Sequence, residues 1–244
     1  MTACREAEPA SGGARATQVR TLFSEIAPRY DLLNHVLSLN IDRRWRQRAI
    51  GELGWDRAAA GTYLDACAGT FDLAMELTER PGFRGRVVGA DFAFPMLAHG
   101  LPKIRRAPVS PVCGDTQRLP FASGSFSGAT VGFGVRNLSE PLAGFRELHR
   151  VLQPGGRLVI LEFTVPPRRF VRAAYMLYFN QILPRVGRIV SGHPWAYTYL
   201  PRSVKGFPGP EVLARLLRQA GFATVNWFLV SAGIAAIHVA VKSR

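Results

Sequence analysis

From residue 62 onward, short apolar runs alternate with helical stretches, and this alternation constrains the fold more than any other feature. Helical patterns at 72–79, 95–104, 141–152 and 210–220 separate most of the runs. Strands that alternate with helices of about ten residues form βαβ units, and therefore a mainly parallel sheet with helices on both faces. The apolar runs, which we expect to be strands, lie at 62–67, 86–91, 109–113, 128–133, 156–163, 223–230 and 234–241.

The last two runs differ from the others in how they are joined. Only Ser231, Ala232 and Gly233 separate them, which is too short for a crossover helix, so they predict an antiparallel hairpin at the edge of the sheet. Right-handed crossovers place the carboxyl ends of the parallel strands on one edge, where ligands bind. A seven-stranded, mostly parallel α/β sheet that closes in an antiparallel hairpin predicts a Rossmann-like, class I methyltransferase fold.

The 244 residues are enough for one large domain but hardly for two. Residues 1–16, rich in Ala, Gly, Pro and Ser, predict a disordered tail. We expect residues 17–244 to form a single domain with a helical N-terminal cap at 17–53, interrupted at Pro28. Residues 164–209 are rich in arginine and aromatic residues and contain no acidic residue. They predict an insertion that covers the active site.

The chain is strongly basic, with 31 Lys and Arg against 17 Asp and Glu and a net charge of +14. This charge is compatible with a solvated basic surface, with docking on anionic lipid, or with nucleic acid. The three cysteines show no CxxC spacing, so we expect reduced cytosolic thiols and no metal site. No signal peptide or apolar run of membrane-spanning length occurs. We therefore expect a cytoplasmic protein that meets membranes only from the surface.

The first run ends in a turn at 65–72 that leads into a helix. Such a turn brings backbone amides and a helix N-terminus close to a ligand. In S-adenosylmethionine the group bound by this turn is the methionine end. Asp65 can accept a hydrogen bond from its α-amino group, and Thr70 can line the same end. Gly69 is the only one of three customary glycines that is kept. An ordinary strand-to-helix turn explains this segment equally well when it is taken alone.

Two further carboxylates follow at the ends of the next two runs. Asp91 can accept both ribose hydroxyls of a nucleoside, although a helix N-cap is the alternative role. The missing GxGxxG motif argues against NAD. Asp115 and Thr116 come where the adenine amino group is expected. One carboxylate at the end of each of three successive strands favours S-adenosylmethionine as the cofactor.

Several segments, taken together and in order, resemble the C-methyltransferases of ubiquinone and menaquinone biosynthesis from about Val19 to the C-terminus. This resemblance implies S-adenosylmethionine-dependent methylation of a ring carbon of a polyprenylated benzoquinol or naphthoquinol. It also implies cofactor contacts by Thr70, Asp91, Asp115 and Thr116. The segments are FSEIAPRYDLLNHVLSLNIDRRWR, LDACAGTFDLA, LPFASGSF, VGFGVRNL, ELHRVLQPGGRLVILEF and YTYLPRSVKGFP.

A quinol carbon is a weak nucleophile until a neighbouring hydroxyl loses its proton, so a base or a relayed water is needed near that hydroxyl. Arg136 and Asn137 are our candidates for stabilising the phenolate. We expect Tyr30 and Tyr197 to border the ring, although both are equally explained as packing residues.

Two residues depart from the family pattern. Phe71 replaces the second glycine of the cofactor turn, and Gly132 stands where many members have serine. Phenylalanine adopts positive φ only at a cost, so either residue 71 has an ordinary backbone conformation or the turn is altered.

The resemblance implies a polyprenyl quinol substrate, peripheral contact with an anionic membrane surface, and a homodimer or a quinone-biosynthesis complex. Nucleic acid is not expected, because the tetrapeptide that RNA methyltransferases place after the fourth strand is missing. Two alternatives remain: a methyltransferase for another small molecule, such as a sterol, polyketide or phenol, and a partner subunit with impaired cofactor binding.

Overall fold

The computed structural model describes residues 21, 23, 24, 27, 40–178, 181 and 203–244. Its centre is a seven-stranded sheet in the order β3-β2-β1-β4-β5-β7-β6. β7 pairs antiparallel with both β5 and β6, and the other pairs are parallel. The predicted class I methyltransferase fold is confirmed. The strands are β1 (Thr62–Ala66), β2 (Arg86–Asp91), β3 (Val109–Cys113), β4 (Phe126–Gly132), β5 (Leu152–Phe163), β6 (Thr224–Val230) and β7 (Ala235–Val241).

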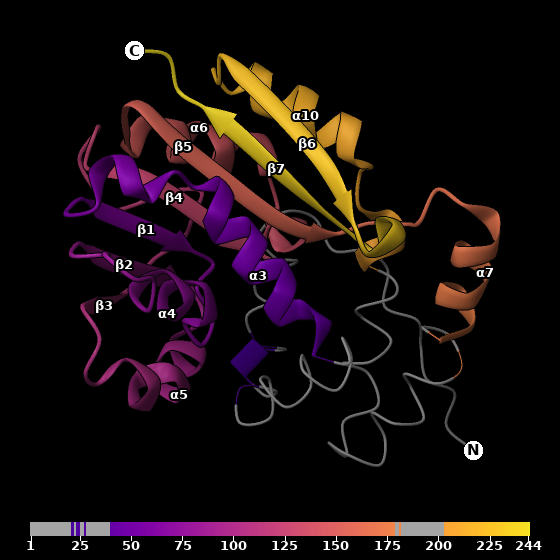
Figure 1. The fold of residues 1–244 in the computed structure, drawn as a ribbon, viewed down its shortest axis with the longest axis horizontal. Helices are drawn as coiled ribbons and strands as arrows, with labels where there is room; N and C mark the ends of the chain where they lie inside the picture. Colours follow the sequence, from indigo (N-terminus) through magenta and orange to yellow (C-terminus); the bar gives the residue numbers. More distant parts are fainter. Residues whose placement is uncertain (1–20, 22, 25–26, 28–39, 179–180, 182–202) are drawn as a thin grey trace.

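Helices cover both faces of the sheet (Figure 1). The helices α3 (Ile41–Glu52), α4 (Asp72–Thr78) and α5 (Phe94–Ile104) bury their apolar sides on one face. The other face carries α6 (Pro141–Val151) and α10 (Pro210–Gln219). The strand order reverses between β1 and β4, because β2 and β3 lie on one side of β1 while β4 and β5 lie on the other. The carboxyl edge of these two strands is therefore the topological switch point where ligands bind in such sheets.

The remaining elements are short or peripheral. The 3-10 turns η2 (Trp55–Ala58) and η3 (Val135–Asn137) precede β1 and follow β4. The 3-10 turn η5 (Ser231–Gly233) joins β6 to β7, and all three of its residues have positive φ. Helix α7 (Arg169–Leu177) follows β5 and stands beyond its carboxyl end, away from the sheet (Figure 1).

The fifth strand begins earlier than the run expected at 156–163, because α6 passes directly into β5 at Leu152. The register jumps from the pair Phe126–Leu152 to the pair Gly128–Arg157, so residues 153–156 bulge within the strand. Gly155 has a φ of 78° and donates its N–H to the Lys242 carbonyl at 3.1 Å. The bulge is therefore held by the chain that follows β7.

The predicted domain boundaries remain predictions, because the tail at 1–16 and about half of the cap and of the insertion lie outside the described residues. Within the described residues, α3 belongs to the cap and α7 to the insertion. Among these residues no helix is long and apolar enough to cross a membrane. In the same part of the chain, no group of three or more His, Cys, Asp or Glu side chains could hold a metal ion.

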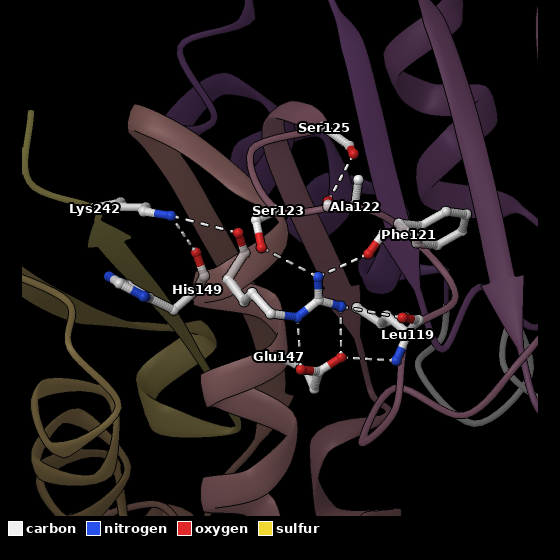
Figure 2. Close-up of polar contacts among 9 residues, drawn as sticks. Leu119, Phe121, Ala122, Ser123, Ser125, Glu147, His149 and Lys242 are labelled. Atoms are coloured by element: carbon white, nitrogen blue, oxygen red, sulfur yellow. Dashed lines mark hydrogen bonds and ion pairs between the residues drawn. The ribbon is translucent and has the colours of Figure 1, made fainter.

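The loop between β3 and β4 is fixed by Arg150 at the end of α6 (Figure 2). Its guanidinium makes two 2.8 Å contacts with Glu147 and donates to the carbonyls of Phe121 and Leu119 at 2.7 and 3.1 Å. Glu147 in turn accepts the Leu119 N–H at 3.0 Å. Arg150 and Glu147 therefore fix the part of this loop that leads from Leu119 to Ser123 into β4.

Phe71 adopts a left-handed backbone conformation, which glycine favours over other residues. Its φ and ψ are 67° and 25°, so it is a left-handed residue at the N-cap of α4, and the alternative of an ordinary conformation is wrong. Its side chain is fully buried. The ring lies where a Cβ on Gly89 of β2 or on Gly100 of α5 would have to be, at 2.5 and 2.6 Å respectively. Two glycines thus make room for the phenylalanine ring.

This packing predicts that Gly89→Ala is destabilising only while Phe71 is present. The added methyl group meets the Phe71 ring, and overpacking of this kind costs about 1–3 kcal/mol. Phe71→Gly alone loses a large buried side chain but relieves the left-handed strain, so we expect it to lower the free energy of unfolding by about 2–4 kcal/mol.

Urea denaturation of the two single variants and the double variant measures the coupling. In the Phe71→Gly background, Gly89→Ala should have almost no further effect. An equal cost of Gly89→Ala in both backgrounds would show that the ring does not occupy this space.

Candidate functional site

The edge formed by the carboxyl ends of β1, β2 and β4 carries two adjoining hollows. The larger, of about 630 Å³, extends over Asp91, Asp115 and Thr116. The smaller, of about 340 Å³, lies over Asp65, Thr70 and Arg46. They share Cys67, Gly69, Gly132 and Phe133, so together they form a single bipartite cavity over the turn that follows β1.

Asp91 ties this turn to the end of β2. One carboxylate oxygen accepts the Gly69 N–H at 2.9 Å, and the other accepts the Ala93 N–H at 2.9 Å. The N-cap of α5 is Ala93, so the alternative role of Asp91 as the helix N-cap is wrong. The side chain is 6% exposed, and burial raises its pKa to about 6. Each oxygen keeps a further lone pair for a hydroxyl, and the carboxylate borders the larger hollow.

Asp65 has a comparable position at the end of β1. Its oxygens accept the Thr130 hydroxyl at 2.9 Å and the Ala74 N–H at 3.1 Å. These contacts connect β1 with β4 and with the first turn of α4. Burial raises the pKa of Asp65 to about 7, although both hydrogen bonds act to lower it. The carboxyl group lines the smaller hollow together with Thr70.

Asp115 and Thr116 line the larger hollow from the loop after β3. Asp115 is exposed and accepts the Gln117 N–H at 2.9 Å. Thr116 is buried, with its hydroxyl 3.4 Å from the Cys67 sulfur. Gln117 accepts the Ser139 hydroxyl at 2.9 Å, which connects this loop with the loop after β4. Burial raises the pKa of the Cys67 thiol, so it is neutral and not a nucleophile.

Arg46 is a site residue that the sequence did not single out. It lies on α3, lines the smaller hollow, and pairs with Asp42 at 2.5 Å and Asp72 at 3.0 Å. Lys103 joins the same cluster by contacting Asp72 at 2.7 Å and the Thr70 hydroxyl at 3.1 Å. In this cluster the buried Arg46 guanidinium lies on the same hollow as Thr70. A guanidinium can bind a carboxylate through two parallel hydrogen bonds. The spacing of the buried positions 42, 45, 46, 49 and 50 was the available signal.

Arg136 and Asn137 are adjacent in η3 and both side chains donate to the Phe133 carbonyl, but only Asn137 is among the described lining residues of a hollow. Asn137 lines the larger hollow. Arg136 contacts Glu162, at the end of β5, at 2.7 Å and also donates to the Phe133 carbonyl. Both partners of this ion pair are buried, and the guanidinium lies 5.6 Å from the centre of the Phe163 ring. The sequence did not point to Glu162, because it lies within an otherwise apolar strand.

Tyr30 and Tyr197 lie outside the described residues, so their predicted contacts with a ring stay predictions. Near Arg136 the structure describes a different tyrosine, Tyr175 of α7, which is buried. Both Arg136 and Glu162 act on its pKa, which burial raises. Gly132, the second departure from the family pattern, lines both hollows, and a Cβ there would meet the Leu73 side chain at 2.7 Å. Leu73 therefore occupies the space that a serine would need.

The cavity has the chemistry of a nucleoside joined to an amino acid. The larger hollow offers a carboxylate with free lone pairs for ribose hydroxyls, and the smaller one offers a carboxyl group and a guanidinium for an amino and a carboxylate group. Phe71 does not obstruct it, because the described lining of neither hollow includes this residue and its ring is turned into the core. The residues present therefore fit S-adenosylmethionine.

Comparisons with solved structures agree with the fold. The cyclase SpnF covers 98% of this chain and 99% of its own with a TM-score of 0.69 and 18% identity. A SAM-dependent methyltransferase from Thermotoga maritima covers 91% of this chain and 99% of its own with a TM-score of 0.60 and 16% identity. Since a cyclase shares the architecture, the fold alone does not decide the reaction.

Sequence comparisons are more specific. The model of the ubiE/COQ5 methyltransferase family matches residues 12–242. A demethylmenaquinone methyltransferase of Thermus thermophilus is 48% identical, with 89% of this chain and 98% of the relative covered. One from Deinococcus radiodurans is 44% identical, with 92% of each covered. A ubiquinone/menaquinone biosynthesis C-methyltransferase UbiE of Geobacter is 39% identical over 93% of this chain and 97% of the relative.

The cofactor of this class, S-adenosylmethionine, fits the bipartite cavity, and the family model spans the cap, the sheet and the hairpin. The chain therefore belongs to the ubiE/COQ5 methyltransferase family and is an S-adenosylmethionine-dependent methyltransferase.

Proposed function

We propose that this enzyme methylates a ring carbon of a polyprenylated quinol in respiratory quinone biosynthesis, with demethylmenaquinol as the substrate. The observation that carries the proposal is the 44–48% identity to relatives named demethylmenaquinone methyltransferase over about nine tenths of the chain. Benzoquinols remain the alternative within the same chemistry, since another relative is named for both quinones.

The cofactor contacts that we propose divide between the two hollows. Asp91 accepts the ribose hydroxyls, and Asp115 with Thr116 borders the adenine. Asp65, Gly69 and Thr70 meet the methionine end. The site chemistry adds Arg46, whose guanidinium receives the carboxylate of that end, supported by its burial beside Thr70. When bound, S-adenosylmethionine supplies an electrophilic methyl group on a sulfonium, so the enzyme mainly has to position the acceptor and exclude water.

We propose that Asn137 and Arg136 act on the acceptor's oxygen. Asn137 borders the larger hollow and can donate a hydrogen bond to a phenolate. Arg136 cannot serve as the base, because its guanidinium stays protonated. The positive charge of Arg136 favours loss of the proton from the acceptor's hydroxyl, while Glu162 holds the guanidinium in one orientation. Tyr30 and Tyr197 are proposed to border the ring.

The polyprenyl tail of such a substrate is insoluble in water, so the enzyme has to reach it at a bilayer. We propose a cytoplasmic protein that associates peripherally with the inner face of the membrane. The net charge of +14 favours an anionic surface. A homodimer or a complex with other enzymes of quinone biosynthesis remains a prediction.

The proposed reaction predicts methyl transfer from S-adenosylmethionine to a reduced demethylmenaquinone. The purified enzyme should add one methyl group to a short-chain demethylnaphthoquinol. Mass spectrometry of the extracted quinone measures this addition. The oxidised quinone is the matched control and should not react, because its ring carbon is not nucleophilic. If the protein binds the cofactor yet methylates neither a naphthoquinol nor a benzoquinol, the proposed substrate class is wrong.

Asp91→Asn should weaken S-adenosylmethionine binding at least tenfold at pH 7.5, because an amide replaces one oxygen that accepts both a backbone N–H and a hydroxyl. Isothermal titration measures the change. Glu76→Gln on α4, whose side chain pairs with Arg80, is the matched control. A change of less than twofold for Asp91→Asn would remove Asp91 from the cofactor site.

The pH dependence of this affinity provides a further readout. In the free protein the ionised form of Asp91 is lost as the pH falls through about 6, and that of Asp65 through about 7. Both carboxylates bind the cofactor as acceptors, so wild-type affinity should fall as the pH falls through this window. The decrease near pH 6 should be missing in Asp91→Asn, and its persistence would contradict the assignment.

Glu162→Gln should reduce kcat about tenfold and leave the affinity for S-adenosylmethionine within twofold of wild type. The reason is that Arg136 loses its charged partner, while the cofactor hollows are unaltered. Steady-state kinetics and titration separate the two effects. Glu52→Gln, which breaks a surface pair with Arg48, is the control and should change neither. An unchanged kcat in Glu162→Gln would show that this ion pair has no part in the reaction.

A further inference from the structure

Helix α7 exposes the side of itself that a soluble helix would normally bury. The four residues at positions i, i+3, i+4 and i+7 are all exposed, and they form one apolar face: Phe170, Ala173, Ala174 and Leu177. The Phe170 side chain is 92% exposed and that of Leu177 is 53% exposed. Tyr175, on another side of the same helix, is only 6% exposed. The helix is therefore anchored through Tyr175 and presents its apolar face outward.

The charges around this face are all positive. Arg168 is the N-cap, Arg169 begins the helix, and Arg172 follows one turn later; all three are exposed. No acidic residue lies in the first turn, and none occurs between residues 164 and 209. Cations at a helix N-terminus oppose the helix dipole. An anionic surface at this position would offset both the dipole and the arginine charges.

The orientation of α7 is set by the chain that precedes it. Arg172 donates to the carbonyls of Pro166 and Pro167 at 2.9 Å each. Pro167 packs on Gly233 of η5, where a Cβ would come within 2.5 Å of the proline ring. The connection from β5 is therefore short and well supported. It holds α7 beyond the carboxyl end of the strand (Figure 1), which is the edge on which the bipartite cavity lies.

We propose that the exposed face of α7 docks on an anionic lipid bilayer, with Phe170 and Leu177 inserted among the acyl chains and Arg168 and Arg169 bound to lipid phosphates. Exposed apolar residues flanked by arginine on one helix are the pattern of an interfacial helix, in which long basic side chains extend to the headgroups. The inference rests on the proposed function, since a bilayer on this edge of the sheet would let a quinol enter the cavity while its tail stays in lipid.

A second copy of the chain is a less suitable occupant. A symmetric pair through this face would bring Arg168, Arg169 and Arg172 of both copies together, and the structure describes no acidic residue on α7 to compensate for them. Anionic lipid supplies the missing negative charge and an apolar phase at the same time. A dimer is therefore an outcome that the experiment has to detect.

Co-sedimentation of the full-length protein with lipid vesicles tests the proposal. The wild type should bind vesicles of phosphatidylglycerol and phosphatidylcholine at least tenfold more tightly than vesicles of phosphatidylcholine alone. Phe170→Ser combined with Leu177→Ser should reduce binding to the mixed vesicles at least tenfold. Arg168→Gln combined with Arg169→Gln should remove the preference for the anionic lipid.

Matched controls come from the opposite part of the sheet. Leu101→Ser alters a residue on α5 that is 46% exposed, and Arg105→Gln with Arg106→Gln removes two exposed arginines just after α5. Both should change vesicle binding less than twofold. If the controls lost as much vesicle binding as the α7 variants, the binding would depend on net charge or general hydrophobicity, and the proposal would be overturned.

Activity separates this proposal from the proposed function. The Phe170→Ser, Leu177→Ser variant should methylate a short-chain quinol at the wild-type rate and lose at least tenfold activity on a polyprenyl quinol in vesicles. Undiminished vesicle binding by this variant would overturn the docking face whatever the activity. Lipid binding without methylation of any quinol would refute the proposed function alone. A wild-type dimer that becomes monomeric in the variant, measured by light scattering, would assign the face to self-association.

Discussion

The hydrogen bonds of Asp91 are the constraint on which the rest of the site depends. One carboxylate accepts the backbone N–H of Gly69 after β1 and that of Ala93 before α5. It therefore fixes the two loops that meet at the topological switch point. Asp65 repeats this arrangement one strand further along, where it joins β4 and α4. The carboxylates that a cofactor would use are thus the same groups that hold the cavity open, so loss of either would affect structure and binding together.

The phenylalanine at position 71 shows how this turn accommodates an unusual residue. The backbone has the left-handed conformation that a glycine would adopt, as it also has at Cys67 in the same turn, and the ring is buried between β2 and α5. Gly89 and Gly100 provide that space. The substitution therefore acts on packing below the cavity and not on the cavity surface, which removes the reason for regarding the chain as a subunit with impaired cofactor binding.

The sequence allowed the strands, the closing hairpin and the three carboxylates to be predicted, because each depends on local periodicity or on strand ends that meet at one edge. Arg46 and Glu162 could not be found in this way, since their partners Asp72 and Arg136 come from other elements and only the folded chain brings them together. The bulge at 153–156 was missed because it depends on Lys242, far along the chain. Tyr30 and Tyr197 remain predictions.

The proposed methylation of a respiratory quinol is tested most directly by the composition of the quinone pool after deletion of the gene in its own organism. A demethylated polyprenyl quinone should accumulate, and a plasmid copy should restore the methylated form, whereas a copy carrying Asp91→Asn should not. An unchanged quinone pool in the deletion strain would contradict the proposed function.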